Sequence, residues 1–156
     1  MRPSDALWDD HEVLRARLAL LEEWVPLVRI TPCMLWLLVD LLAKDLRRHT
    51  AKEERLTAAL ASGIDAQSVS RIQHLQDDHD NQRTQLAILH ELLEHCGEGS
   101  AEAVFVQATH LINDLREHMA KEEQGLFWLI DQECEEEGER VAASGEDHVE
   151  QFLHHA

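Results

Sequence analysis

The decapeptide DLRRHTAKEE, Asp45–Glu54, occurs a second time as DLREHMAKEE at Asp114–Glu123. The two copies lie sixty-nine residues apart and are identical at eight of ten positions. Upstream, LWDDHEVLRARLALL at Leu7–Leu21 is matched by LQDDHDNQRTQLAIL at Leu75–Leu89, with an offset of sixty-eight. Each half of the chain therefore contains a DDH segment followed by an HxxxE segment, and this order indicates an internal duplication.

Composition narrows the class of function. The chain has 156 residues, enough for one domain with a sizeable core, and a formal net charge of −17. Such an acidic protein is unsuited to nucleic acid, whose phosphates require neutralisation by Lys and Arg, and to anionic membranes. We therefore expect neither partner. The acidic surface is either simply solvated or attracts cations towards an interior site.

Cysteine usage indicates the compartment. Cys33, Cys96 and Cys134 are odd in number, widely spaced and without a CxxC motif, which favours buried thiols in a reducing, cytoplasmic environment over a disulfide framework. The acidic N-terminus is unlike a signal peptide. The longest apolar run, Cys33–Val39, is too short to span a bilayer.

Four long segments have the apolar periodicity of helices. The predicted helices run from about residue 5 to 25, from 32 to 61, from 66–70 to 96 and from 100 to 132. Ser4 is the expected N-cap of the first, Pro26 ends or kinks it, and Gly97 stops the third. Because short loops place long helices antiparallel, residues 1–135 are predicted to form an all-α, up-down-up-down four-helix bundle.

Two regions have open interpretations. Residues 136–156 form an acidic C-terminal extension, in which Asp147–His155 could form a final short helix. The first part of the second helix, Cys33–Ala43 (CMLWLLVDLLA), is apolar nearly all the way round. This part is either deep core or a contact surface, such as that of a homodimer.

Register places four histidines, one from each predicted helix, in a single layer. In an antiparallel helix pair, residues equidistant from the turn lie at the same height. The midpoints of successive histidine pairs fall at residues 30, 64 and 98–99, each within a predicted connection, and an error of three residues displaces a side chain by only about 4.5 Å. The four histidines are His11, His49, His79 and His118.

Two glutamates belong to the same layer. Glu53 and Glu122 each follow a histidine of the layer by four residues, so each pair shares one helix face. Four imidazoles and two carboxylates buried without a cation would be costly, whereas a metal makes the cluster favourable. Four histidine bonds and four from bridging carboxylates suit two ions, with positions left for a small ligand. Mixed nitrogen and oxygen donors suit iron, manganese or zinc, and we favour iron.

The combined pattern, His then HxxxE in each half, resembles the hemerythrin-like, or HHE cation-binding, family over roughly residues 5–132. The resemblance implies a non-haem di-iron site with an oxo or hydroxo bridge between the ions and with Glu53 and Glu122 bridging them. It also implies a role in binding, sensing or reacting with dioxygen, nitric oxide, peroxide or iron itself. Some relatives with two HxxxE motifs repair damaged iron centres.

The chain departs from the oxygen-carrying hemerythrins in two places. Those proteins carry HxxxH on the third helix, where the residue four after His79 is here Arg83, and they end with HxxxxD, where this chain has HxxxE with Glu123 at the five-spaced position. One histidine ligand is therefore absent, and we expect a more open and more symmetric site. Sensing or redox chemistry is favoured over simple oxygen carriage. The alternatives are a peroxide-consuming enzyme and an interaction module that orders when iron binds.

Acidic residues near the layer have two interpretations. Asp45 and Asp114, one turn before their histidines, either accept a ring N–H from a ligand histidine or pair with a neighbouring basic residue. Asp10 and Asp78 are weaker candidates for the same supporting role. The pocket should be walled by Leu126, Phe127 and Trp128.

Two arginines, two glutamates and a glycine near the layer also have two interpretations each. Arg15 and Arg83 either pair with an acidic residue of the site or extend to the end of the bundle. Glu54 and Glu123 lie about 100° from the ligand face, so surface positions are favoured, with Glu123 as a reserve ligand. Gly125, inside a helix, either relieves a bulge or lets a neighbouring backbone approach.

Overall fold

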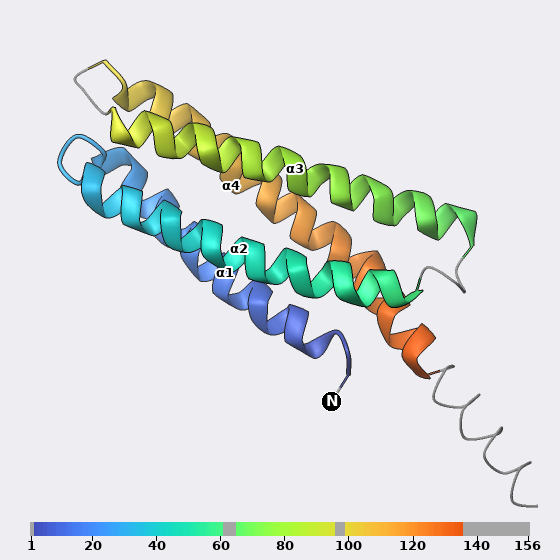
Figure 1. The fold of residues 1–156 in the computed structure, drawn as a ribbon. Coiled ribbons are helices and arrows are strands. Elements are labelled where there is room, and N and C mark those ends of the chain that lie inside the picture. Colours follow the sequence, from blue (N-terminus) through green and yellow to red (C-terminus); the bar gives the residue numbers. More distant parts are fainter. Residues whose placement is uncertain (1, 61–64, 96–98, 136–156) are drawn as a thin grey trace, which may run out of the picture.

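The computed structural model describes residues 2–60, 65–95 and 99–135, and in these ranges the protein is a bundle of long helices (Figure 1). The elements are α1 (Asp5–Trp24), η1 (Val25–Leu27), α2 (Pro32–Leu60), α3 (Ala66–Glu94), α4 (Ala101–Lys121) and η2 (Glu122–Leu126), and residues 127–135 continue the last helix. Each helix packs against the next, and α1 also contacts α4. The predicted all-α, up-down-up-down bundle is confirmed.

The helix ends agree with the sequence only in part. Asp65 caps α3, because its Oδ1 accepts a hydrogen bond from the backbone N–H of Ser68 at 2.9 Å. The expected cap of α1 is wrong: Ser4 makes no side-chain capping bond. Its backbone N and its Oγ instead donate to the carboxylate of Asp131 at 3.1 and 2.7 Å, which ties the start of α1 to the last helical turns. Gly97 and residues 136–156 lie outside the described residues.

The apolar core is divided into two parts by a polar layer. The larger part lies towards the α1–α2 and α3–α4 connections and includes the fully buried Leu18 and Leu111. The smaller part, at the opposite end, includes Leu7, Leu75 and Phe127. Along every helix, the histidines and glutamates of the predicted layer fall between residues of these two parts. Burial of apolar side chains on both sides therefore sets the height of the polar layer in the bundle.

The first part of α2 is not buried on all sides, so the deep-core interpretation holds for one face only. Leu35 and Leu42 are fully buried. Three apolar residues on one face of α2, at spacings of three and four, are between 43% and 51% exposed, and Ile30, just before the helix, is 80% exposed. These four residues are named the α2 stripe: Ile30, Met34, Leu37 and Leu41. One side of this helix therefore packs in the core, and the other presents an apolar surface.

The expectation of buried thiols is wrong for the two cysteines that the structure describes. Cys33 and Cys134 are both exposed. Cys33 is the second residue of α2, and Cys134 is the second-last described residue, so both lie near helix ends where fewer side chains cover them. Within the described ranges, no helix is long and apolar enough to cross a bilayer.

The last helix changes its winding at the polar layer. The segment η2 is π-helical, with the N–H of Phe127 bonded to the carbonyl of Glu122 five residues earlier. Gly125 lies in this segment, as the bulge interpretation requires. The alternative, close approach of a neighbouring backbone, is wrong, because a Cβ added at Gly125 would meet nothing within 4 Å. The repeated sequence in α2 is regular α-helix, so the two halves differ here.

Replacing Leu42 by Ala should lower the free energy of unfolding by about 2–5 kcal/mol, because its side chain is fully buried. The neighbouring Leu41, which is 43% exposed, is the matched control, and Leu41→Ala should cost much less. Urea unfolding followed by circular dichroism, with chelator in every sample, measures both changes. Equal losses would contradict the orientation of α2 in the bundle.

Candidate metal centre

All six residues of the predicted layer lie together in the bundle interior, and none is more than 2% exposed. Each helix contributes one histidine, and the two glutamates come from α2 and from the first position of η2. The six residues are His11, His49, Glu53, His79, His118 and Glu122. They are arranged as two overlapping groups of potential metal ligands.

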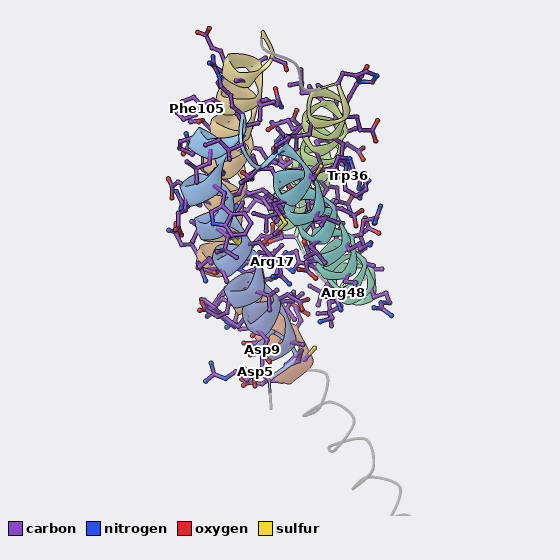
Figure 2. The ribbon with its side chains drawn as sticks, turned by 90° about the vertical axis from the view of Figure 1, so that its left-hand side faces the viewer. Asp5, Asp9, Arg17, Trp36, Arg48 and Phe105 are labelled. Carbon is purple, nitrogen blue, oxygen red and sulfur yellow. The ribbon has the colours of Figure 1, made fainter. Side chains whose placement is uncertain are left out.

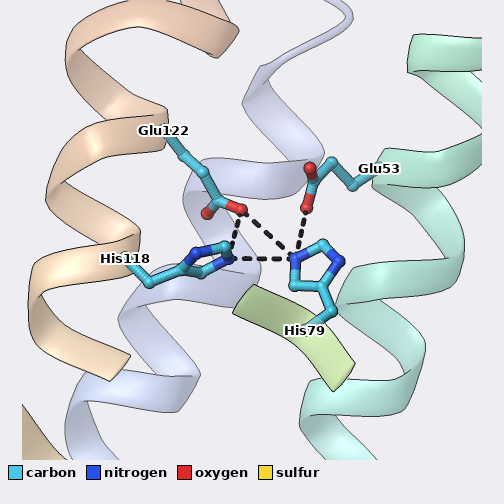
Figure 3. A group of neighbouring side chains, drawn as sticks. All are labelled: Glu53, His79, His118 and Glu122. Carbon is cyan, nitrogen blue, oxygen red and sulfur yellow. Dashed lines mark hydrogen bonds and ion pairs between the residues drawn. The ribbon is translucent and has the colours of Figure 1, made fainter. Parts of the chain in front are cut away.

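The first group is drawn in Figure 3 and consists of Glu53, His79, His118 and Glu122, whose ligand atoms lie within 4.8 Å of one another. His118 Nε2 is 2.7 Å from Glu122 Oε1 and 2.9 Å from His79 Nε2. His79 Nε2 is 3.2 Å from Glu53 Oε2 and 3.6 Å from Glu122 Oε1. Two imidazoles and two carboxylates therefore converge on a space of the size that one ion needs.

The second group consists of His11, His49 and Glu122. His11 Nε2 is 2.9 Å from Glu122 Oε2 and 3.4 Å from His49 Nε2, and His49 Nε2 is 3.5 Å from the same glutamate oxygen. Glu122 belongs to both groups, with Oε1 facing one pair of histidines and Oε2 facing the other. The two groups could thus hold two metal ions, with Glu122 between them.

Glu53 is placed less symmetrically than Glu122. Its Oε2 is 3.2 Å from His79 Nε2 but 3.8 Å from His49 Nε2, and it belongs to only one group. The geometry gives the shared position to Glu122 and places Glu53 mainly on the His79 side. A bridging role for Glu53 stays a prediction.

The charges of the layer shift one another's pKa. Burial alone would raise the pKa of Glu122, but the four histidine rings around its carboxylate hold that pKa well below its ordinary value. Burial raises the pKa of Glu53, and the Glu122 carboxylate adds to the rise, although the neighbouring His79 ring opposes it. Burial would lower the pKa of His79, yet the neighbouring carboxylates of Glu122 and Glu53 raise it to about 9. The layer therefore favours an added positive charge, whether a proton or a metal ion.

The donor atoms fit a cation better than they fit one another. Within the described part of the chain, Glu53 Oε2 and Glu122 Oε1 are buried without a partner of hydrogen-bonding geometry. The Nε2 atoms of His79 and His118 face each other at 2.9 Å, and their hydrogen bond uses only one hydrogen. Buried nitrogen and oxygen atoms whose lone pairs face a common centre can coordinate a metal ion. This mixture of donor atoms suits iron, manganese or zinc.

The outward ring nitrogens of two histidines face carboxylates from neighbouring helices. His118 Nδ1 lies 3.5 Å from Asp78 Oδ2, and His49 Nδ1 lies 3.8 Å from Asp10 Oδ2. Metal-binding histidines commonly direct their second ring nitrogen to a carboxylate, which fixes the tautomer. Asp10 and Asp78, the weaker candidates in the sequence, are therefore the ones that lie near the rings.

The local-pairing interpretation is correct for Asp45, which pairs with Arg48, whereas the hydrogen-bond partner of Asp114 is a glutamine of the neighbouring helix. Asp45 accepts a hydrogen bond from Arg17 Nε at 3.2 Å and also pairs with Arg48, and both arginines are labelled on the α1–α2 side of the bundle in Figure 2. Asp114 accepts a hydrogen bond from Gln85 of α3 at 2.5 Å. Both carboxylates join neighbouring helices instead of facing the centre.

Glu123 is not the surface residue that the periodicity favoured. Its side chain is 16% exposed, its Oε1 lies 2.7 Å from His11 Nδ1, and it also pairs with Arg15. Arg15 thus pairs with an acidic residue at the centre, whereas Arg83 pairs with Asp80 and Glu54 at the surface. A helical period of 3.6 residues did not reveal the inward position of Glu123, because that position lies in the π segment.

Of the three predicted wall residues, Phe127 lies against the centre. Phe127 is buried with its ring 4.9 Å from that of His11, and Leu126 is also buried. Trp128 is 61% exposed and instead lines a groove of about 790 Å³ on the outside of the bundle. The groove lies between α3 and the last helix and reaches Asp78 beside the centre. It could not be seen in the sequence, since its lining comes from two distant segments.

Replacing His118 by Ala should greatly lower the metal content, because it removes a donor from the group of four. His74→Ala is the matched control: His74 is an exposed histidine in the groove wall and belongs to neither group. Both variants are loaded anaerobically with Fe²⁺, desalted and measured by elemental analysis. Similar metal loss in the two variants would show that these groups do not bind the ions.

Comparison with known proteins identifies no relative: no family model, no curated protein and no solved structure matches this chain. The sequence and the structure together establish a four-helix, all-α protein with buried histidine and glutamate groups that could bind two metal ions.

Proposed function

We propose that this protein binds two iron ions in the manner of hemerythrin-like proteins and uses them to bind, sense or react with dioxygen, nitric oxide or peroxide. One observation carries the proposal. The carboxylate of Glu122 lies between two pairs of histidines, with Oε1 2.7 Å from His118 Nε2 and Oε2 2.9 Å from His11 Nε2. A carboxylate shared in this way suits a pair of ions, and the order His then HxxxE in both halves supports the same family.

The number of protein donors supports an open centre. One group offers two imidazoles and two carboxylates, and the other offers two imidazoles and one carboxylate. The second set is that of non-haem iron sites with two histidines and one carboxylate, which leave positions open for a small ligand. Iron bound there would supply one-electron and oxygen chemistry that the side chains themselves lack.

The residues around the layer limit what can reach it. Leu7 and Phe127 belong to the part of the core on one side of the layer, Leu115 and Met119 belong to the part on the other side, and none of the four is more than 2% exposed. Such buried surroundings suit a ligand of two non-hydrogen atoms better than a bulky substrate. The proposal is therefore limited to diatomic molecules and peroxide.

The exposed α2 stripe favours an additional role in self-association. The α2 stripe is apolar and exposed, and residues 30–39 contain no charged side chain. Two copies with a net charge of −17 each repel one another over most of their surfaces, and an uncharged stripe is where that repulsion is smallest. We propose that the stripe forms a homodimer contact, with the same residues on both copies.

Iron should raise the melting temperature, because the site does not exist in the unfolded chain and binding stabilises only the folded state. Free Fe²⁺ at one hundred times its dissociation constant should add about 2.7 kcal/mol for each site. Anaerobic differential scanning calorimetry of chelated and iron-loaded protein measures the shift. Identical melting curves would mean that the folded protein does not bind iron preferentially.

Iron-loaded protein should change its visible absorption spectrum after exposure to air, nitric oxide or peroxide, and apoprotein should not. Steady-state consumption of peroxide, followed with excess reductant, then separates an enzyme from a binding or sensing protein. Many turnovers for each di-iron centre would favour the peroxide-consuming alternative, and a single stoichiometric change would favour sensing. A spectrum insensitive to all three molecules would overturn the proposal.

Leu37→Lys should weaken self-association, because it places a charge within the α2 stripe at a residue that is 51% exposed. Phe105→Lys, at a similarly exposed apolar residue of α4, is the control and should leave association unchanged. Sedimentation equilibrium of the wild type and both variants provides the test. A wild type that is monomeric at all concentrations would rule out the homodimer.

A further inference from the structure

The internal repeat allows each residue of the centre to be compared with its counterpart. His11 corresponds to His79 at an offset of sixty-eight, and Glu54 corresponds to Glu123 at an offset of sixty-nine. In equivalent halves, the Nδ1 atoms of the two histidines would have equivalent partners. They do not: His11 Nδ1 lies 2.7 Å from Glu123 Oε1, while His79 Nδ1 has no hydrogen-bond partner among the described residues.

The cause of this difference lies in the backbone. Glu123 is the second residue of η2, where the wider π-helical turn carries its side chain inward, to 16% exposure. Glu54 follows Glu53 in regular α-helix, and its side chain stays 50% exposed, 3.5 Å from Arg83 at the surface. The same two-residue sequence, Glu-Glu, therefore has a different geometry in each half.

Arg15 completes the arrangement on the His11 side. Its guanidinium pairs with Glu123 and also with Glu12, 2.9 Å away. Held in this way, the Glu123 carboxylate accepts the Nδ1–H of His11. With a hydrogen held on Nδ1, Nε2 is the ring nitrogen left for a metal ion, and it faces the second ligand group, 2.9 Å from Glu122 Oε2.

We infer that Glu123 is a positioning residue for His11 and makes the two metal sites unequal. The inference rests on the proposed function. An ion held by His11, His49 and Glu122 would have three protein donors and would depend on Glu123 for the tautomer and orientation of one of them. An ion on the His79 side would have four donors, and the Nδ1 of His79 has no hydrogen-bond partner among the described residues.

The experiment is a titration of the metal-free protein with Zn²⁺, which has no redox chemistry and binds nitrogen and oxygen donors at least as tightly as Fe²⁺. The wild type should bind two equivalents. In Glu123→Ala, one equivalent should bind as before and the other roughly 10–100-fold more weakly. Glu54→Ala is the matched control from the other half and should bind both equivalents as the wild type does.

Conservative replacement separates positioning from simple packing. The amide oxygen of Glu123→Gln can still accept the Nδ1–H, so this variant should recover part of the affinity that Glu123→Ala loses. Circular dichroism of the metal-free variants confirms that they fold. The inference would be overturned if Glu123→Ala and Glu54→Ala lowered the affinity for Zn²⁺ equally, or if neither lowered it. Either result would leave the proposed function standing. A wild type that binds fewer than two equivalents would instead contradict the proposed function.

A measurement on the wild type covers the case in which Glu123→Ala does not fold. Nitrogen-15 NMR of the ring atoms in the zinc-loaded protein reports the tautomer of each histidine. His11 should carry its hydrogen on Nδ1, and this hydrogen should exchange with solvent more slowly than that of His79. A His11 ring protonated at Nε2, or exchange as fast as at His79, would show that Glu123 does not position the ring.

Discussion

The contact between one buried carboxylate and four imidazoles is the interaction on which this structure depends. Glu122 is fully buried and lies within 3.6 Å of a ring nitrogen from every helix. A buried carboxylate without compensating partners costs several kcal/mol, so the four rings and the glutamate must occupy one height for the bundle to be stable. The apolar residues on either side of the layer enforce that height. The electrostatic interactions of Glu122 and the packing of the apolar residues therefore both fix the relative heights of the four helices along the bundle axis.

This dependence explains why the centre could be found without a structure. A sequence repeat with short connections determines which residues of neighbouring helices lie level, and the spacing of four between His49 and Glu53 determines which side chains share a face. Both arguments use only the regular geometry of the α-helix. Helix number, helix order and the gathering of the six polar residues all follow from that geometry, and they are the parts that agree with the structure.

The structure differs from the sequence predictions where the backbone departs from regular α-helix or where residues distant in sequence contact one another. Glu123 faces inward because the backbone is π-helical, and a glycine in the segment was the only sign. Ser4 binds Asp131 instead of capping its own helix, which no local pattern reveals. The stripe at the start of α2 is exposed because the four-helix bundle leaves one side of α2 uncovered, whereas composition alone left both deep core and a contact surface open. The sequence pattern identified the six residues of the layer. The residues that contact them from outside the layer could be identified only from the tertiary structure.

The π segment also bears on how the two halves came to be joined. Each half is a helical hairpin, and two separate copies of one hairpin would assemble about a rotation axis running through the centre. Under that symmetry, the two copies would have the same backbone conformation. A π-helical turn is present after His118 and absent after His49, and sequence divergence between two hairpins of one polypeptide permits this difference. Joining two hairpins in one polypeptide thus lets a twofold arrangement of similar donors acquire two chemically distinct sides.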